Sequence, residues 1–189
     1  VYTATFTPDA DGATTIDVNA GVFTDIGSNN NTAADQFNWT YDGTAPTVTS
    51  VNSIVANGTY NADDSINIFI VSSEVVTVTG TPQITLETGD DDAVASYSSG
   101  SGGFILTFTY NISSGENSSD LDYVSANALS LNSGTIKDSA GNSLVLTLPT
   151  PGADNSLGSN KDIVVDTTAP TMTITSTTAG VTDGTTTND

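Results

Sequence analysis

Apolar and polar residues alternate with a period of two along much of the chain, and this pattern constrains the fold more than any other feature. The clearest case covers residues 104–112, where apolar side chains fill the even positions and mostly Thr and Asn fill the odd ones. Such alternation is typical of β-strands that bury one face. Turn-forming clusters, such as 89–92 and 99–103, separate the alternating segments, and no segment has a convincing helical period. The sequence therefore predicts an all-β fold.

The composition excludes several classes of function. The 189 residues include 22 acidic and 2 basic side chains, no histidine and no cysteine, for a formal net charge of -20. A catalytic triad with histidine, a thiolate or imidazole zinc site and a disulfide cannot be built from these residues. The negative charge repels phosphate backbones and anionic lipid headgroups. We expect a protein that is not an enzyme, has no organic cofactor, binds no nucleic acid and does not insert directly into a membrane.

Two segments of the chain repeat earlier ones at constant offsets. Residues 19–29 match residues 132–142 at an offset of 113, and residues 42–47 match residues 166–171 at an offset of 124. Repetition at a fixed spacing is the mark of a tandem array of similar units. The second offset is larger than the first because extra residues lie between the two matched segments. These extra residues fall within 147–157, where a loop insertion is predicted.

Each unit runs from one Thr-Ala-Pro-Thr motif to the next. The chain is then expected to hold one complete immunoglobulin-like sandwich (45–166), preceded by strands E, F and G of another (1–44) and followed by strand A of a third (167–189). Trp39 is expected in the core of the first unit. The strands of the complete domain are predicted at 47–51 (A), 65–72 (B), 75–79 and 83–88 (C region), 93–98 (D), 104–112 (E), 128–137 (F) and 162–166 (G).

Several motifs resemble the bacterial immunoglobulin-like repeats of giant surface proteins, including Swm-type repeats and the repeats of large adhesins. The motifs are the Thr-Ala-Pro-Thr boundaries, residues 73–76, 119–123 and 137–142, and Ala13-Thr14-Thr15-Ile16. Residues 25–29 depart from the usual Asp-x-Ala-Gly-Asn turn. The resemblance implies an extracellular or cell-surface location, and repeats that usually act as spacers.

The acidic residues fall mainly in predicted loops and linkers. At the end where the complete domain receives its linker, Asp42 is expected to approach Glu74 in the B–C loop and Asp138 in the F–G loop. Carboxylates without basic partners suit a hard cation, so Ca²⁺ is the candidate ligand. A second group is expected near the exit linker. It comprises Asp63, Asp64, Asp90 to Asp92, Asp120, Asp122 and Asp166.

Several acidic residues also have a structural interpretation. Aspartate accepts hydrogen bonds from nearby amides in turns, so Asp25 and Asp138 fit turn capping. Asp122 beside Tyr123 fits an arrangement like the tyrosine corner of sandwich domains. The turn at residues 9–12 resembles half of a calcium loop but lacks the remaining ligands.

Three functions are consistent with these features. The preferred one is a structural extender of a large bacterial adhesin or extracellular filament, stiffened by Ca²⁺ at its linkers, with adjacent repeats as partners. The second is a filament subunit that completes its partial domains with strands from neighbouring copies. The third is an adhesive module that binds a host-surface or glycan receptor through loops such as 89–93 and 99–103.

Overall fold

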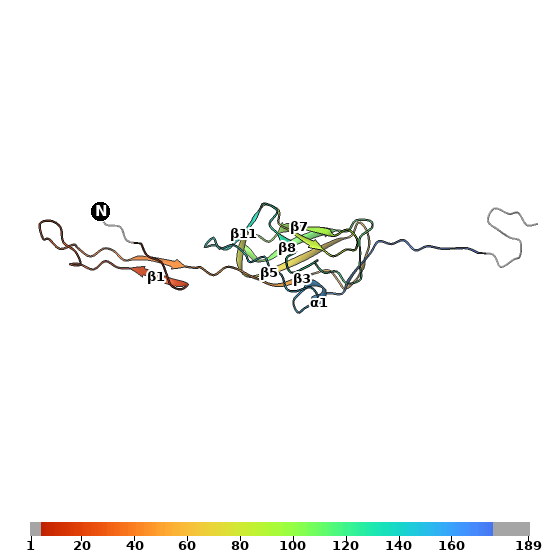
Figure 1. Cartoon of the computed structure of the whole chain (residues 1–189), viewed down its shortest axis with the longest axis horizontal. Helices are drawn as coiled ribbons and strands as arrows, with labels where there is room; N and C mark the ends of the chain where they lie inside the picture. The colour runs from red at the N-terminus through yellow and green to blue at the C-terminus, as the bar shows by residue number, and fades with distance from the viewer. Residues whose placement is uncertain (1–4, 176–189) are drawn as a thin grey trace, which may run out of the picture.

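The computed structural model describes residues 5–175, and these form an all-β structure with one helical turn, as the alternation predicts. Figure 1 shows an elongated chain, with a hairpin at one side of a central domain and an extended segment at the other. The elements are β1 (Gly12–Ile16), β2 (Phe37–Tyr41), β3 (Val48–Ser53), β4 (Gly58–Tyr60), β5 (Ser65–Thr79), β6 (Gln83–Leu86), β7 (Ala93–Ser99), β8 (Gly103–Asn111), β9 (Asn117–Ser118), β10 (Leu129–Ser130), β11 (Thr135–Lys137), α1 (Leu157–Asn160) and β12 (Ile163–Asp166).

The largest sheet has the strand order β10-β6-β7-β8-β5-β11, and β3 pairs with β5 beside this path. Its inner face carries the alternating apolar residues, and Ile68 lies opposite Phe108 on the neighbouring strand, both fully buried. Ile70 and Leu106 form the next buried pair. Because each such side chain contributes about 1.5–3 kcal/mol when it leaves water, this face of β5 and β8 is the centre of the core.

β5 replaces two predicted strands, B and the first C-region strand, with a single strand of 15 residues. Its pairing with β8 shifts register between Val71 and Val76, and its second half pairs with β11. Ser72 and Ser73 lie at this irregularity, where their hydroxyls accept hydrogen bonds from the N–H groups of Glu74 and Thr47. With no Gly or Pro there, the chain bends through a bulge instead of a turn. Glu74 therefore lies within a strand, not in a loop.

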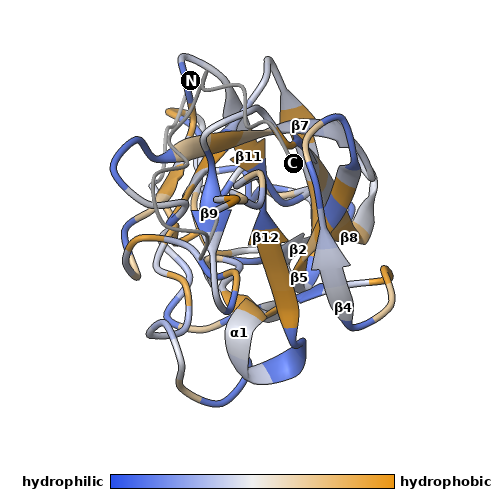
Figure 2. Ribbon diagram, turned by 90° about the vertical axis from the view of Figure 1, so that its right-hand side faces the viewer, coloured by the Kyte–Doolittle hydropathy of each residue, from blue (hydrophilic) through white to orange (hydrophobic). Residues whose placement is uncertain are grey.

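A small second sheet has the order β4-β12-β9, with β4 parallel and β9 antiparallel to β12. Figure 2 shows the apolar β12 between these two more polar strands. The sequence did not predict β4 or β9. The predicted strand F is divided into β10 and β11, because Asn132 and Ser133 adopt positive φ values of 45° and 65° between them. Left-handed backbone cannot continue a strand.

The predicted insertion is packed against the domain. The Tyr123 hydroxyl donates to the Pro149 carbonyl at 2.5 Å, and the Gly152 N–H donates to Asp122 at 3.0 Å. Leu148 is buried, as is Leu157 at the start of α1. Tyr123 thus ties down a loop far along the chain, whereas a tyrosine corner bonds to backbone a few residues upstream. No helix among residues 5–175 is long and apolar enough to cross a membrane.

The segment before the complete domain is a hairpin of β1 and β2 in which Ile16 pairs with Phe37 and Thr14 with Trp39. Trp39 is half-buried and contacts the rings of Phe6 at 5.5 Å and Phe37 at 5.3 Å. Phe37 is 63% exposed, and no residue of 5–44 is buried. The expected core around Trp39 is thus not enclosed by the described residues. Residues 5–8 form no strand, and residues 1–4 lie outside the described range.

The segment after β12 is extended and forms no strand in residues 167–175. Met172 is 86% exposed and Ile174 is 87% exposed. The predicted strand A of a following unit therefore has no partner strand within the described part of the chain, and its remaining residues lie outside that part.

Candidate metal centre

Three carboxylates converge where the hairpin joins the complete domain. Each of Asp42, Glu74 and Asp138 offers a carboxylate oxygen, and these three oxygens lie within 4.8 Å of one another. Asp42 directly follows β2, Glu74 lies at the bulge of β5, and Asp138 directly follows β11. The sequence predicted that these three residues would meet at this end, and the structure brings them together. We call them the junction triad.

Asp138 is the most firmly held member of the junction triad, with 7% of its surface exposed. Its carboxylate accepts hydrogen bonds from the N–H groups of Gly141 (2.7 Å) and Asn142 (2.8 Å) and from the Asn142 side chain (2.9 Å). Burial raises the pKa of Asp138, but these hydrogen bonds outweigh it and hold the pKa below its ordinary value. Asp138 thus caps its turn, as the structural interpretation predicts, and its carboxylate is ionised at neutral pH.

Asn142 also fixes the linker. Its side-chain amide donates to the Asp42 carbonyl at 3.1 Å while it bonds to the Asp138 carboxylate. One amide therefore holds the backbone of one triad residue against the side chain of another.

Glu74 is half-buried. Burial raises the pKa of Glu74, and the nearby negative charges of Asp42, Asp138 and Asp11 raise it further. Four carboxylates thus share one region, and each of the other three raises the pKa of Glu74. A divalent ion bound to oxygen ligands would relieve this repulsion.

Asp11 is the residue that sequence reasoning left out of this group. It lies in the turn before β1, and its carboxylate accepts hydrogen bonds from the Gly43 N–H at 2.6 Å and from the Thr44 hydroxyl. These hydrogen bonds lower the pKa of Asp11, that from Thr44 most. The calcium-loop likeness of residues 9–12 was the available signal. Asp11 ties the hairpin to the linker beside the junction triad.

Replacing Glu74 by glutamine is expected to stabilise the calcium-free chain at neutral pH. Because the pKa of Glu74 is raised in the folded chain above its ordinary value of 4.5, the ionised side chain destabilises the fold. This cost disappears as the pH falls through the raised pKa towards 4.5. Urea unfolding in chelator from pH 4 to 7.5 should show an advantage of Glu74→Gln that shrinks as the pH falls. An advantage that is equal at every pH would contradict this cause.

The acidic residues predicted at the exit end do not form one group. Asp120 lies near Asp122 and Asp162, and burial first, then these two charges, raises the pKa of Asp120. The Asp122 carboxylate accepts hydrogen bonds from the N–H groups of Tyr123 at 2.9 Å and of Gly152 at 3.0 Å. Asp122 therefore serves the packing of the insertion. Within residues 5–175, the junction triad is the only acidic group with ligand spacing.

Asp63 and Asp64 lie in the turn before β5. The Asp64 carboxylate accepts the Asn61 N–H at 2.9 Å, and Asp63 has a positive φ of 73°. Asp91 lies in another turn, where its carbonyl accepts the Thr88 hydroxyl at 3.0 Å. These aspartates shape turns. Among the described residues, they do not belong to a group of carboxylates with the spacing of metal ligands.

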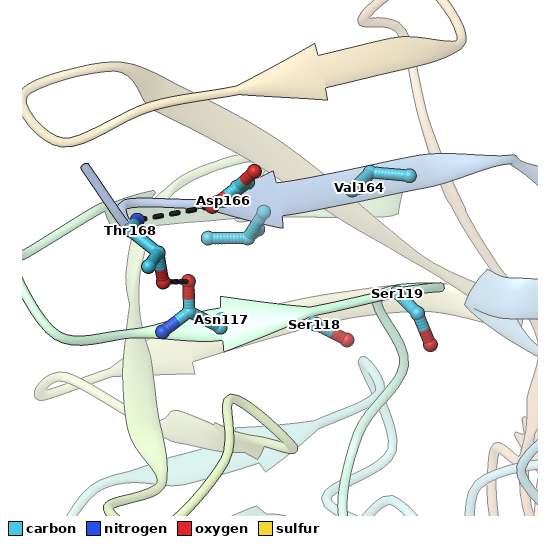
Figure 3. A pocket seen from close by; sticks show the side chains of 7 residues that line it. Asn117, Ser118, Ser119, Val164, Asp166 and Thr168 are labelled. Atoms are coloured by element: carbon cyan, nitrogen blue, oxygen red, sulfur yellow. Dashed lines mark hydrogen bonds between the residues drawn. The ribbon is translucent and has the colours of Figure 1, made fainter. Parts of the chain in front are cut away.

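Asp166 ends β12 at a shallow groove between β12 and β9 (Figure 3). Its carboxylate accepts the Thr168 N–H at 3.0 Å, and the Thr168 hydroxyl donates to the Asn117 side chain at 3.1 Å. Asp166 orders the exit linker and is not gathered with Asp120 or Asp122.

No protein-family model matches the chain, and no curated protein and no solved structure matches it either. Function is therefore inferred from the chain's own residues.

Proposed function

We propose that the chain is a structural extender made of immunoglobulin-like repeats in a large bacterial surface or extracellular protein. Bound Ca²⁺ at the junction triad stiffens the link between successive repeats. The observation that carries the proposal is the convergence of Asp42, Glu74 and Asp138 at the linker. Each comes from a different segment, so an ion bound by all three joins the linker to two parts of the domain.

The strand order supports the immunoglobulin-like part of the proposal. The pairings β3-β5, β5-β8 and β7-β8 give the order β3-β5-β8-β7, which corresponds to the order A-B-E-D of one sheet in that fold. β6 differs, because it continues this sheet beside β7 where strand C of the fold belongs to the opposite sheet.

The hydrogen bonds at the two domain exits support a repeated linker. Thr44 donates its N–H to Asp42 at 3.1 Å, and Thr168 donates its N–H to Asp166 at 3.0 Å. Both threonine hydroxyls also donate to an acidic or amide side chain of the domain they leave, Asp11 and Asn117. Linkers with the same anchors give a regular spacing between domains, which an extender requires.

The chemistry of the side chains favours a mechanical role over catalysis. The chain has no histidine or cysteine, and within residues 5–175 its carboxylates lie outside the strands, except for those of Glu74 and Asp166. Repulsion among bare carboxylates loosens a junction, and neutralisation by an ion favours its ordered form.

Small-angle X-ray scattering of the full chain tests this function. We expect the maximum dimension to be larger and better defined in Ca²⁺ than in chelator, because the hairpin and domain are then held in line. Glu74→Gln should scatter alike in both conditions. An identical scattering profile of the unaltered chain with and without Ca²⁺ would contradict the role of calcium in the proposal. The chain would then be proposed only as a spacer.

A further inference from the structure

Asn57 is the only asparagine of the chain that is followed by a glycine. Asparagine is chemically labile, and an Asn-Gly pair is especially so because glycine has no side chain to hinder its backbone nitrogen. That nitrogen attacks the side-chain Cγ of the asparagine and closes a five-membered ring. The amide nitrogen leaves as ammonia, with the proton that the glycine nitrogen gives up. Water then opens the ring at either carbonyl carbon, which leaves aspartate or isoaspartate.

The surroundings of this peptide leave it open to water. Asn57 and Gly58 are both exposed, and the space beside Gly58 is empty, since an added Cβ would meet no atom within 4 Å. Neighbouring side chains therefore do not block closure of the ring. Protection of Asn57 in the folded domain has to come from hydrogen bonds.

Asp162 holds both of the groups that would react. The Asn57 side-chain amide donates to the Asp162 carboxylate at 2.9 Å, and the Gly58 N–H donates to the Asp162 carbonyl at 3.0 Å. From this point β4 runs parallel to β12, with Gly58 opposite Ile163. Ring closure requires the Asn57 side chain to turn away from the carboxylate and the Gly58 nitrogen to give up the proton that the carbonyl binds. The paired strands therefore oppose the reaction at both atoms.

We propose that Asn57 is a deamidation site that Asp162 keeps closed in the folded domain, so that Asn57 is modified when β4 separates from β12. Local opening of short edge strands costs less than unfolding of the whole domain, so this separation occurs while the core stays folded. The inference goes beyond the extender function and does not depend on calcium.

The modification prevents β4 from pairing again in the same way. A carboxylate at position 57 has no N–H to donate and lies beside the negative charge of Asp162, which is already close enough to Asp120 to raise the pKa of Asp120. Isoaspartate adds a carbon to the backbone, which shifts the register of a strand of only 3 residues. Because ammonia is lost, the change does not reverse. Deamidation at Asn57 therefore leaves a permanent record that this sheet has opened.

Peptide mapping by mass spectrometry tests the proposal on the full chain, incubated at mildly alkaline pH with and without urea. Deamidation of Asn57 should be at least about tenfold slower in the folded chain than in urea. Asp162→Ala should raise the folded rate about tenfold, as the loss of one charge-assisted hydrogen bond does. Asp162→Asn keeps a side-chain oxygen that accepts from the Asn57 amide, so it should restore a rate close to that of the unaltered chain.

Two further variants separate this effect from general loosening of the domain. Asp162→Ser also removes the carboxylate at an exposed position, and should match Asp162→Ala while circular dichroism shows a folded chain. Asp166→Ala changes the other end of β12, where the carboxylate bonds to Thr168, and should leave the rate at Asn57 unaltered. Equal rates in the folded and the unfolded chain would overturn the proposal. So would folded Asp162→Ala and Asp162→Ser chains that deamidate no faster than Asp166→Ala.

Discussion

Calcium is expected to raise the midpoint of thermal unfolding of the chain by about 5–10 °C when the free ion is about 100-fold above its dissociation constant. A ligand that binds only the folded state contributes roughly 2.7 kcal/mol at that ratio, and each kcal/mol shifts the midpoint by about 2–4 °C in a chain of this size. The proposed ligands, Asp42, Glu74 and Asp138, come from separate segments, so unfolding would destroy the site. Differential scanning calorimetry with Ca²⁺ and with chelator measures the shift.

Matched variants assign this shift to the junction triad. Glu74→Gln should unfold at the same temperature with and without calcium, because one of its three carboxylates is gone. Asp120→Asn removes a carboxylate with a raised pKa at a different place, and should keep the full calcium shift. An equal shift in Glu74→Gln would place the calcium elsewhere.

Replacing Gly134 by alanine is expected to destabilise the complete domain by about 3 kcal/mol, in the upper part of the range for overpacking. A Cβ at Gly134 would overlap the carbonyl oxygen of Thr79 and lie 3.0 Å from that of Leu131. Gly80 approaches from the other side, where its own Cβ would lie 2.8 Å from the Gly134 Cα. These are backbone atoms, so no side chain can rotate away. Urea unfolding followed by circular dichroism measures the loss.

The same substitution should weaken calcium binding, because Gly134 sets the approach of β11 to β5 and Asp138 directly follows β11. Gly115→Ala is the control. Its added Cβ meets nothing within 4 Å and its φ is 99°, so only backbone strain of about 1 kcal/mol is expected. Calcium affinity should be unchanged in this control. A Gly134→Ala chain as stable as Gly115→Ala would contradict the close approach of the two strands.

The sequence predicted the strands that have strong alternation and clear turns. Strands expected at 104–112 and 93–98 correspond to β8 and β7. The very short β4 and β9 could not be recognised, because they have too few residues for a period. The helical turn α1 begins with Ser156 as its N-cap, a signal hidden in a stretch with no helical period. At the bend in β5 the sequence predicts two separate strands. The structure has one strand there, and Ser72 and Ser73 lie at a bulge that needs no turn.

The junction triad could be predicted because the repeat fixed the linker and one loop relative to the strand ends. Asp42 begins one repeated segment and Asp138 lies within the other, so their approach follows from the order of the strands. The exit residues could not be placed in this way. Asp122 packs against the insertion at Gly152, and Asp166 is held by its own linker at Thr168. These contacts depend on tertiary packing that no repeat encodes.

The central claim is that Ca²⁺ at the junction triad stiffens the link between the hairpin and the complete domain. A distance measured across this junction tests that claim most directly. Spin labels at Asn38→Cys in β2 and Val94→Cys in β7 place one label in the hairpin and one in the complete domain, both at exposed positions. Double electron–electron resonance spectroscopy should give a narrow distance distribution in Ca²⁺ and a broad one in chelator. In the Glu74→Gln variant the distribution should be broad in both conditions. A distribution of the same width with and without Ca²⁺ would contradict a calcium-stiffened junction.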